Sequence, residues 1–159
     1  MTPIQNIKIQ RSNSSNLDFL SLVKLLDIDL AIRDGADHSF YAQYNKLDKI
    51  NHVVIAYVGQ IPMGCGAFKE YEKDKVEIKR MYVLENYRNK GIAGLILHSL
   101  EQWAIELGYS SAILETGLMQ PEAIGLYKKS GYDNIPNYGQ YAGIENSVCF
   151  HKILTKDLK

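Results

Sequence analysis

The chain has 159 residues, a length typical of one folded domain, which we expect to span residues 1–159. Eighteen basic and eighteen acidic residues give zero formal net charge, which argues against general attraction to nucleic acid or anionic membranes. Cys65 and Cys149 stand far apart, so we expect no disulfide scaffold and no metal site, and two free thiols suit the cytoplasm. No apolar run approaches the roughly 18 residues of a membrane span.

The first third of the chain predicts one short strand and two helices. Three isoleucines between Ile4 and Ile9 are typical of an edge strand. Residues from Leu17 to Leu30 follow helical spacing up to the stop at Asp34-Gly35, and the candidate N-caps are Ser14, Ser15 and Asn16. The apolar residues from His38 to Leu47 predict a second, shorter helix.

The middle of the chain predicts three antiparallel strands at His52–Val58, Pro62–Glu70 and Val76–Leu84. Gly59-Gln60 is typical of a tight hairpin turn. Gly64 and Gly66 lie inside the second of these strands, where glycine indicates a bulge or a close approach of another segment.

The last third alternates helices and strands. An amphipathic helix is predicted from Gly91 to Leu107, a strand at Ser111–Glu115, a helix at Gln120–Lys129 and a final strand at Asn146–Leu154, with a further short strand near Tyr132. This order predicts an α/β (α+β) domain with a mixed sheet of six to seven strands and about four helices. It contains one parallel strand-helix-strand crossover.

The segment Arg88–Gly94 joins a predicted strand to a predicted helix. The first amide groups of a helix lack intrahelical partners, and with the helix dipole they form a site for an anion. Gly91 and Gly94 leave room for a diphosphate, and Arg88 and Lys90 add positive charge. The alternative is a solvated basic turn, which this pattern alone does not exclude.

Two motifs place this loop in a wider context. The stretch from Glu77 to Ala93 resembles the central motif of the GNAT superfamily of N-acetyltransferases, whose pattern [QR]-x-x-G-x-[GA] is met by Arg88, Gly91 and Ala93. The segment Ala123–Tyr132 resembles the family's second motif, A-x-x-x-Y-x-x-x-G-[FY], at every marked position. Together the motifs cover about a third of the chain.

The resemblance implies a GNAT-like fold in which the two central parallel strands splay apart and hold acetyl-CoA between them. It implies that the pyrophosphate lies on the loop and that backbone groups of the preceding strand bind the pantetheine arm, with the amide of Met81 or Tyr82 as oxyanion donor. The implied cofactor-binding residues are Met81, Tyr82, Val83, Arg88, Asn89, Lys90, Gly91, Ile92, Ala93 and Gly94.

The resemblance also suggests two catalytic residues. Glu77 is the candidate general base, and regular strand alternation places it on one face with Lys79, Met81 and Val83. The alternatives are an ion-paired glutamate at this position, a water chain as the base, or Glu115 in its place. Tyr127 matches the tyrosine that faces the coenzyme sulfur in many relatives and is the candidate general acid; the alternative is a packing tyrosine.

The acceptor pocket of such a protein is built from its first helices and its last hairpin. The candidates to line it are Arg33, Tyr41, Arg80, Tyr138 and Tyr141, and either arginine could hold a substrate carboxylate; ordinary surface roles are the alternative. His38 is expected to be structural.

The predicted function is acetyl transfer from acetyl-CoA to a primary amine, by direct attack in a ternary complex. The neutral chain favours a small-molecule acceptor over a basic peptide, and it predicts no nucleic-acid or membrane partner. A homodimer agrees with the family, although the sequence carries no interface signature. The alternatives are a peptide N-acetyltransferase, a non-catalytic acyl-CoA sensor and, despite the missing Walker pattern, a nucleotide-binding module.

Overall fold

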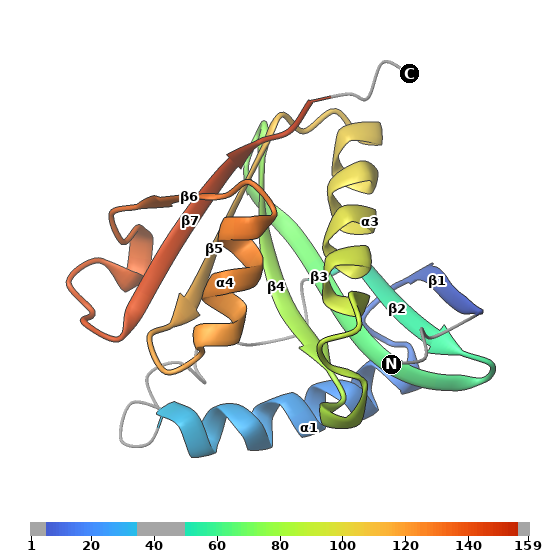
Figure 1. Ribbon diagram of the computed structural model, residues 1–159. Helices are drawn as coiled ribbons and strands as arrows, with labels where there is room; N and C mark the ends of the chain where they lie inside the picture. The colour runs from blue at the N-terminus through green and yellow to red at the C-terminus, as the bar shows by residue number, and fades with distance from the viewer. Residues whose placement is uncertain (1–5, 35–49, 156–159) are drawn as a thin grey trace.

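The computed structural model describes residues 6–34 and 50–155, and in these ranges one mixed sheet has the order β1-β2-β3-β4-β5-β7-β6 (Figure 1). The strands are β1 (Ile7–Ser12), β2 (His52–Val58), β3 (Ile61–Glu72), β4 (Lys75–Val83), β5 (Ser111–Gly117), β6 (Asp133–Ile135) and β7 (Ser147–Ile153). The helices are α1 (Leu17–Asp34), α3 (Ile92–Glu106) and α4 (Pro121–Lys129), with 3-10 turns η2 (Glu85–Tyr87) and η3 (Gly139–Tyr141).

The predicted fold class is confirmed: in the described part of the chain the sheet has seven strands, and only β4 and β5 pair in parallel. The predicted helix from His38 to Leu47 lies outside the described residues.

Local chemistry explains where the helices α1 and α4 begin. The Asn16 side-chain oxygen accepts the amide hydrogens of Asp18 and Phe19 at 2.9 and 3.1 Å, and Pro121 occupies the first turn of α4. None of the described helices is long and apolar enough to cross a membrane.

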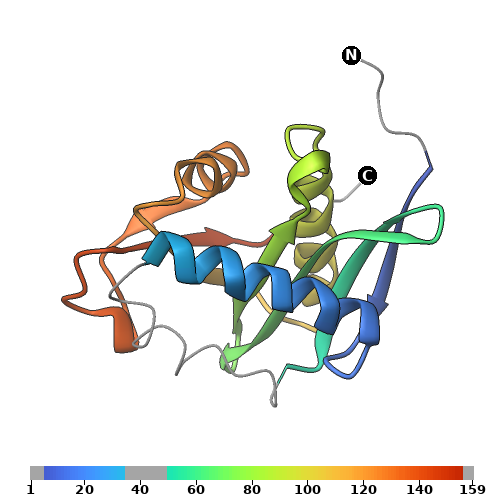
Figure 2. The same ribbon diagram turned by 90° about the horizontal axis from the view of Figure 1, so that it is seen from below.

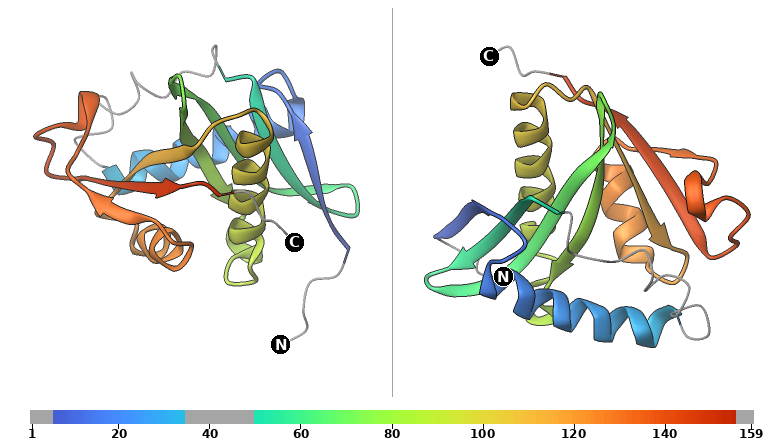
Figure 3. Two further views of the ribbon diagram at one scale, coloured as in Figure 1. Left: turned by 90° about the horizontal axis from the view of Figure 1, so that it is seen from above. Right: turned by 180° about the vertical axis from the view of Figure 1, so that it is seen from behind.

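Helices cover both faces of the sheet (Figures 2 and 3). On one face, α1 packs through Phe19, Leu22 and Val23 against Val53 and Ile55 of β2. On the other face, α3 and α4 enclose a second apolar cluster, which contains the alternate β2 residues Val54 and Ala56 and, from the helices, Ile92, Ile96, Leu97, Leu100 and Tyr127. Because both faces are covered, β2 is buried along almost its whole length, which agrees with its β-branched apolar sequence.

The sheet opens at its centre. β4 and β5 pair only through Lys75–Ser111, Val76–Ala112 and Glu77–Ile113, although both strands continue beyond these pairs. Figure 1 shows the two strands diverging below this point, with α1 passing across the open end. From residue 78 to residue 83, the edge of β4 that faces β5 therefore has no strand partner in the described chain, and its backbone groups are available to a ligand.

A bulge in β4 lies beside this opening. The β3–β4 register shifts between Cys65 and Ala67, and Arg80 adopts a left-handed conformation with φ of 61°. Such a conformation costs a non-glycine residue about 1–3 kcal/mol. Gly66 stands opposite, where an added Cβ would lie 2.5 Å from the sulfur of Met81, so the predicted bulge or close approach at the β3 glycines is confirmed.

The bulge corrects one expectation about which β4 side chains share a face. Regular alternation would place Met81 and Val83 beside Glu77, but both pack instead in the cluster under α3. Because Arg80 adds one residue to the strand, Glu77, Lys79 and Arg80 all project toward the α1 face, where Arg80 reaches Asp27 of α1. The bulge thus separates the polar β4 side chains from the apolar ones.

Candidate active site

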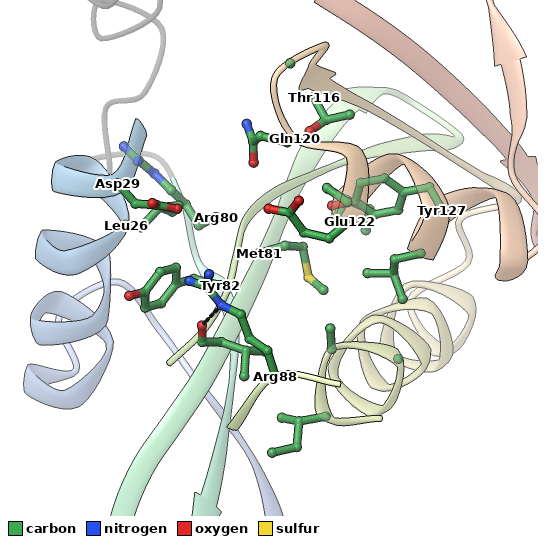
Figure 4. Close-up of a pocket in the computed structure, with 18 of the residues that line it drawn as sticks. Leu26, Asp29, Arg80, Met81, Tyr82, Arg88, Thr116, Gln120, Glu122 and Tyr127 are labelled. Carbon is green, nitrogen blue, oxygen red and sulfur yellow. Dashed lines mark hydrogen bonds between the residues drawn. The ribbon is translucent and has the colours of Figure 1, made fainter. Parts of the chain in front are cut away.

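A cavity of about 840 Å³ fills the opening between β4 and β5 and is lined from both faces of the sheet. The lining residues on the side of α3 and α4 include Met81, Val83, Ile92, Ala93 and Tyr127. The lining residues on the α1 side include Glu77 and Lys79. They also include Leu26, Asp29 and Arg80, which are labelled in Figure 4. The cavity therefore runs through the sheet, so that ligands entering from opposite faces would meet between the strands.

The predicted anion loop lies at the end of this cavity where β4 leads into α3. Gly91 is the N-cap of α3 and has a φ of 83°. The first amide of the helix that donates to the Gly91 carbonyl is that of Leu95, at 3.1 Å. The amides of Ile92, Ala93 and Gly94 have no backbone or side-chain acceptor among the described residues. Since a Cβ added at Gly91 or Gly94 would meet nothing within 4 Å, this cradle has the open space that a diphosphate requires.

The three polar residues of the loop, Arg88, Asn89 and Lys90, differ in whether they line the cavity. The Nε of Arg88 donates to the Val83 carbonyl at 2.8 Å, and its guanidinium lies over the ring of Tyr82, which holds the charge at the cavity edge. Asn89 also lines the cavity and adopts a positive φ of 63°. Lys90 is not among the lining residues. The structure thus places Arg88 and Asn89 at the cavity and Lys90 outside its lining, with the Arg88 side chain held in place by its hydrogen bond.

Glu77 lies at the last residue pair between β4 and β5, where the two strands begin to separate, and it is only 3% exposed. Its Oε2 accepts a 2.6 Å hydrogen bond from the Tyr138 hydroxyl. The ammonium groups of Lys69 and Lys79 lie 3.8 and 3.9 Å from its Oε1. These three partners hold the Glu77 carboxyl group in place at the wall of the cavity.

Three further groups, Lys79, Arg80 and Glu115, bring charge to the α1 side. Lys79 is buried, and this burial lowers the pKa of its ammonium, an effect that the nearby Glu77 carboxylate opposes. The side chain of Arg80 is 4% exposed and donates from Nη1 to Asp27 at 2.8 Å. Glu115 of β5 lies on the same face, and the Ser147 hydroxyl donates to it at 2.7 Å. This side of the cavity therefore presents both signs of charge.

Tyr127 extends from α4 into the cavity between the strands (Figure 4). Its ring packs against Tyr132 and Phe150 with centroid separations of 5.8 and 5.9 Å. Burial and then the Glu115 charge raise the pKa of the Tyr127 hydroxyl, so it keeps its proton at neutral pH. A buried, protonated hydroxyl in this position can donate a proton to a group held between the strands.

The predicted acceptor residues separate into three groups. Arg80 and Tyr141 line the cavity, whereas Tyr138 does not and contacts Glu77 instead. Tyr41 and the side chain of Arg33 lie outside the described parts of the chain. Sequence reasoning missed several lining residues, which are Asp29, Thr116, Gln120, Glu122 and Leu126. None of them occupies a marked position of either motif, although Leu126 lies within the second motif segment.

Comparison with known proteins agrees with this geometry. The sequence profile described as the acetyltransferase (GNAT) family matches residues 21–132. The chain belongs to the GNAT family. Its motifs around the loop and around Tyr127 both fall within the matched region, so the resemblance noted in the sequence is confirmed.

Individual relatives of this GNAT chain extend the agreement over nearly its full length. A protein of Azospirillum brasilense named IAA acetyltransferase is 30% identical over 152 residues, which cover 94% of this chain and 99% of that protein. A Klebsiella pneumoniae structure assigned as an acyl-CoA N-acyltransferase has a TM-score of 0.78 at 25% identity, covering 94% of this chain and 98% of the other. A GNAT structure from Elizabethkingia anophelis, solved with acetyl-CoA bound, has a TM-score of 0.68 at 21% identity, with coverages of 94% and 99%. The chain is thus an acetyltransferase of the GNAT family.

Proposed function

We propose that the chain transfers the acetyl group of acetyl-CoA to a primary amine of a small molecule, by direct attack in a ternary complex. The observation that carries this proposal is the cavity through the sheet, which has the anion loop on one face and Glu77 on the other. A cofactor anchored at the loop and an amine entering from the α1 side would meet between β4 and β5. No covalent enzyme intermediate is needed for that arrangement.

Acetyl-CoA would supply the acetyl group as a thioester, and residues of this chain would supply binding and proton transfer. The free amides of Ile92 to Gly94 would hold the pyrophosphate, and the unpaired edge of β4 would hold the pantetheine arm. The fit is supported by the open space around Gly91 and Gly94 and by Arg88 at the cavity edge.

The proton transfers would involve two groups on opposite sides of the opening. Glu77 would first take a proton from the substrate ammonium, and the lone pair of the free amine would then attack the acyl carbon. The nitrogen would lose a second proton as the amide forms, and this proton would balance the one that the leaving sulfur gains. The developing oxyanion would accept from the amide of Met81 or Tyr82. Tyr127 would give its proton to the sulfur as the carbon–sulfur bond breaks. Two free, buried cysteines and a cytoplasmic cosubstrate support a cytoplasmic setting for this reaction.

A thiol-release assay tests the proposed function. The protein is mixed with acetyl-CoA and each member of a broad panel of small amines, and free coenzyme A is measured with a thiol reagent. We expect acceptor-dependent thiol release with small primary amines, and less with basic peptides. If CoA stabilises the protein against heat while no amine or peptide increases thiol release, the chain is an acyl-CoA sensor and the catalytic proposal is wrong.

Replacing Tyr127 by Phe tests the general acid. Removing one proton donor should lower kcat by about 100-fold, because general-acid catalysis typically contributes that much. The KM for acetyl-CoA should change little, since the ring still packs on Phe150. Because the pKa of Tyr127 is raised, we also expect no loss of wild-type rate from its ionisation as the pH rises through 9.

Tyr132→Phe is the matched control, since its hydroxyl donates to Glu101 at 2.9 Å and does not line the cavity. This variant should be destabilised by about 1 kcal/mol while its kcat stays unchanged. Equal losses of kcat in both variants would show that the tyrosines act through packing.

A further inference from the structure

We infer that the acceptor carries a carboxylate as well as its amine, and that Arg80 is the residue that recognises this carboxylate. The inference rests on the proposed function, because it names the class of amine that the α1 side of the cavity would select. It starts from a guanidinium that lies in the cavity wall, is almost fully buried and has spare hydrogen-bonding capacity.

The spare capacity of Arg80 is the first observation. A guanidinium has five N–H donors, and among residues 6–34 and 50–155 this one has a single acceptor, the Asp27 carboxylate at Nη1. Its Nε–H is buried and has no acceptor within the described chain. A buried donor without an acceptor is a cost to the folded protein. A carboxylate bound side-on to the guanidinium, after a small local adjustment, would satisfy it.

The position of Arg80 is the second observation. The residue holds an unfavourable left-handed conformation at the β4 bulge, and this conformation turns its side chain to the α1 face of the opening (Figure 4). A regular strand would turn it to the opposite face. The bulge thus places the guanidinium on the same wall as Glu77, three residues earlier, or roughly 10 Å along a strand.

The arrangement of charge on this wall is the third observation. Lys79 adds a second buried cation between Glu77 and Arg80, and both cations line the cavity. The side chain of Asp27, the ion-pair partner of Arg80, is half exposed. Its negative charge is therefore partly screened by water and only partly neutralises the buried Arg80 guanidinium. A ligand with an amine at one end and a carboxylate at the other matches a wall that offers a carboxylate at Glu77 and cations at Lys79 and Arg80. An alkylamine without a carboxylate would leave the Nε–H of Arg80 without an acceptor.

The test compares matched acceptors. Methionine, phenylalanine, β-alanine and 6-aminohexanoate are each assayed beside their carboxamides and beside the amines that lack the carboxyl group. For the wild-type protein, kcat/KM should favour the carboxylate over its carboxamide in at least one set. Arg80→Met should reduce this preference by about 10- to 100-fold, and Arg80→Lys should restore part of it, because lysine keeps the charge and loses the planar fork.

Asp27→Asn is the control variant, because it weakens the ion pair and leaves the guanidinium in place. It should retain the carboxylate preference. A CoA-induced rise in Tm checks that each variant is folded and binds the cofactor. The same acceptors are also tested for their effect on the Tm of the CoA complex, which requires no turnover.

The outcomes separate this inference from the proposed function. Turnover of amines with no carboxylate preference, or a preference that survives Arg80→Met, overturns the role of Arg80 and leaves the acetyltransferase proposal intact. Carboxylate-dependent stabilisation of the CoA complex without turnover supports the recognition site and contradicts the catalytic proposal. If no carboxylate in the panel is either acetylated or bound in preference to its carboxamide, the inference is wrong.

Discussion

Replacing Gly94 by Glu is expected to weaken CoA binding by about 100-fold while making the free protein more stable. Gly94 is the third residue of α3, beside the amides that would hold the pyrophosphate. A carboxylate about 5 Å from a diphosphate charge costs roughly 3 kcal/mol at an effective dielectric constant near 20, which corresponds to about two orders of magnitude in affinity.

The same substitution favours the helix itself. Glycine is a poor helix former, and a negative charge in the first turn interacts well with the helix dipole, so Gly94→Glu should raise the free energy of unfolding by about 1 kcal/mol. A Cβ at this position meets nothing within 4 Å, so no clash opposes the gain. Titration calorimetry with CoA and chemical denaturation of the free protein measure the two effects.

Gly125→Glu is the matched control for this prediction. Gly125 is an exposed glycine of α4 with open space around it, and it does not line the cavity. The same change of residue and charge should stabilise the protein and leave CoA affinity within about twofold, because this exposed residue does not line the cavity and its charge is screened by solvent. Similar losses of affinity in both variants would mean that the pyrophosphate does not bind at α3.

Glu77→Gln is expected to lower kcat by at least about 100-fold, with little change in the KM for acetyl-CoA. Glutamine keeps the size of the side chain and can still accept the Tyr138 hydroxyl, but it cannot take a proton. The loss should shrink as the pH rises, because more of the acceptor amine is then already deprotonated. Steady-state rates between pH 7 and pH 10 measure both effects.

Glu115→Gln gives the matched comparison across the opening. Glu115 also lines the cavity on the α1 side, and its hydrogen bond from Ser147 can persist with glutamine. If Glu77 is the base, Glu115→Gln should keep most of the activity. The reverse result would transfer the role to Glu115. Full activity in both variants would favour a water chain as the base.

The loop and the crossover could be predicted because local chemistry determines them. A helix that begins at Gly91 leaves its first amides free wherever it lies, and a parallel strand pair requires a crossover helix such as α3. The motif around Tyr127 lies within a single helix and its C-terminal end, so its register could be read directly. In each of these features, the residues that act together are also close together in the sequence.

The arrangement of the α1 side could not be predicted in the same way. Gly66 indicated a bulge or a close approach, but which β4 residue would take the left-handed conformation depends on the packing of Met81 beneath α3. The hydrogen bond from Tyr138 to Glu77 joins residues 61 positions apart. Helix α1 has exposed apolar residues, including Ile28 and Ile32, so its spacing alone did not identify the buried face.

The central claim, that the loop before α3 binds the pyrophosphate of an acyl-CoA, is tested most directly by following backbone amide signals in an NMR titration of the wild-type protein with CoA. We expect the largest saturable shifts at Ile92, Ala93 and Gly94, with further shifts along the unpaired β4 edge from Met81 to Val83. ATP at the same concentration should produce smaller shifts, since it lacks the pantetheine arm. CoA shifts that leave residues 92–94 unchanged, or equal shifts with ATP, would contradict the assignment.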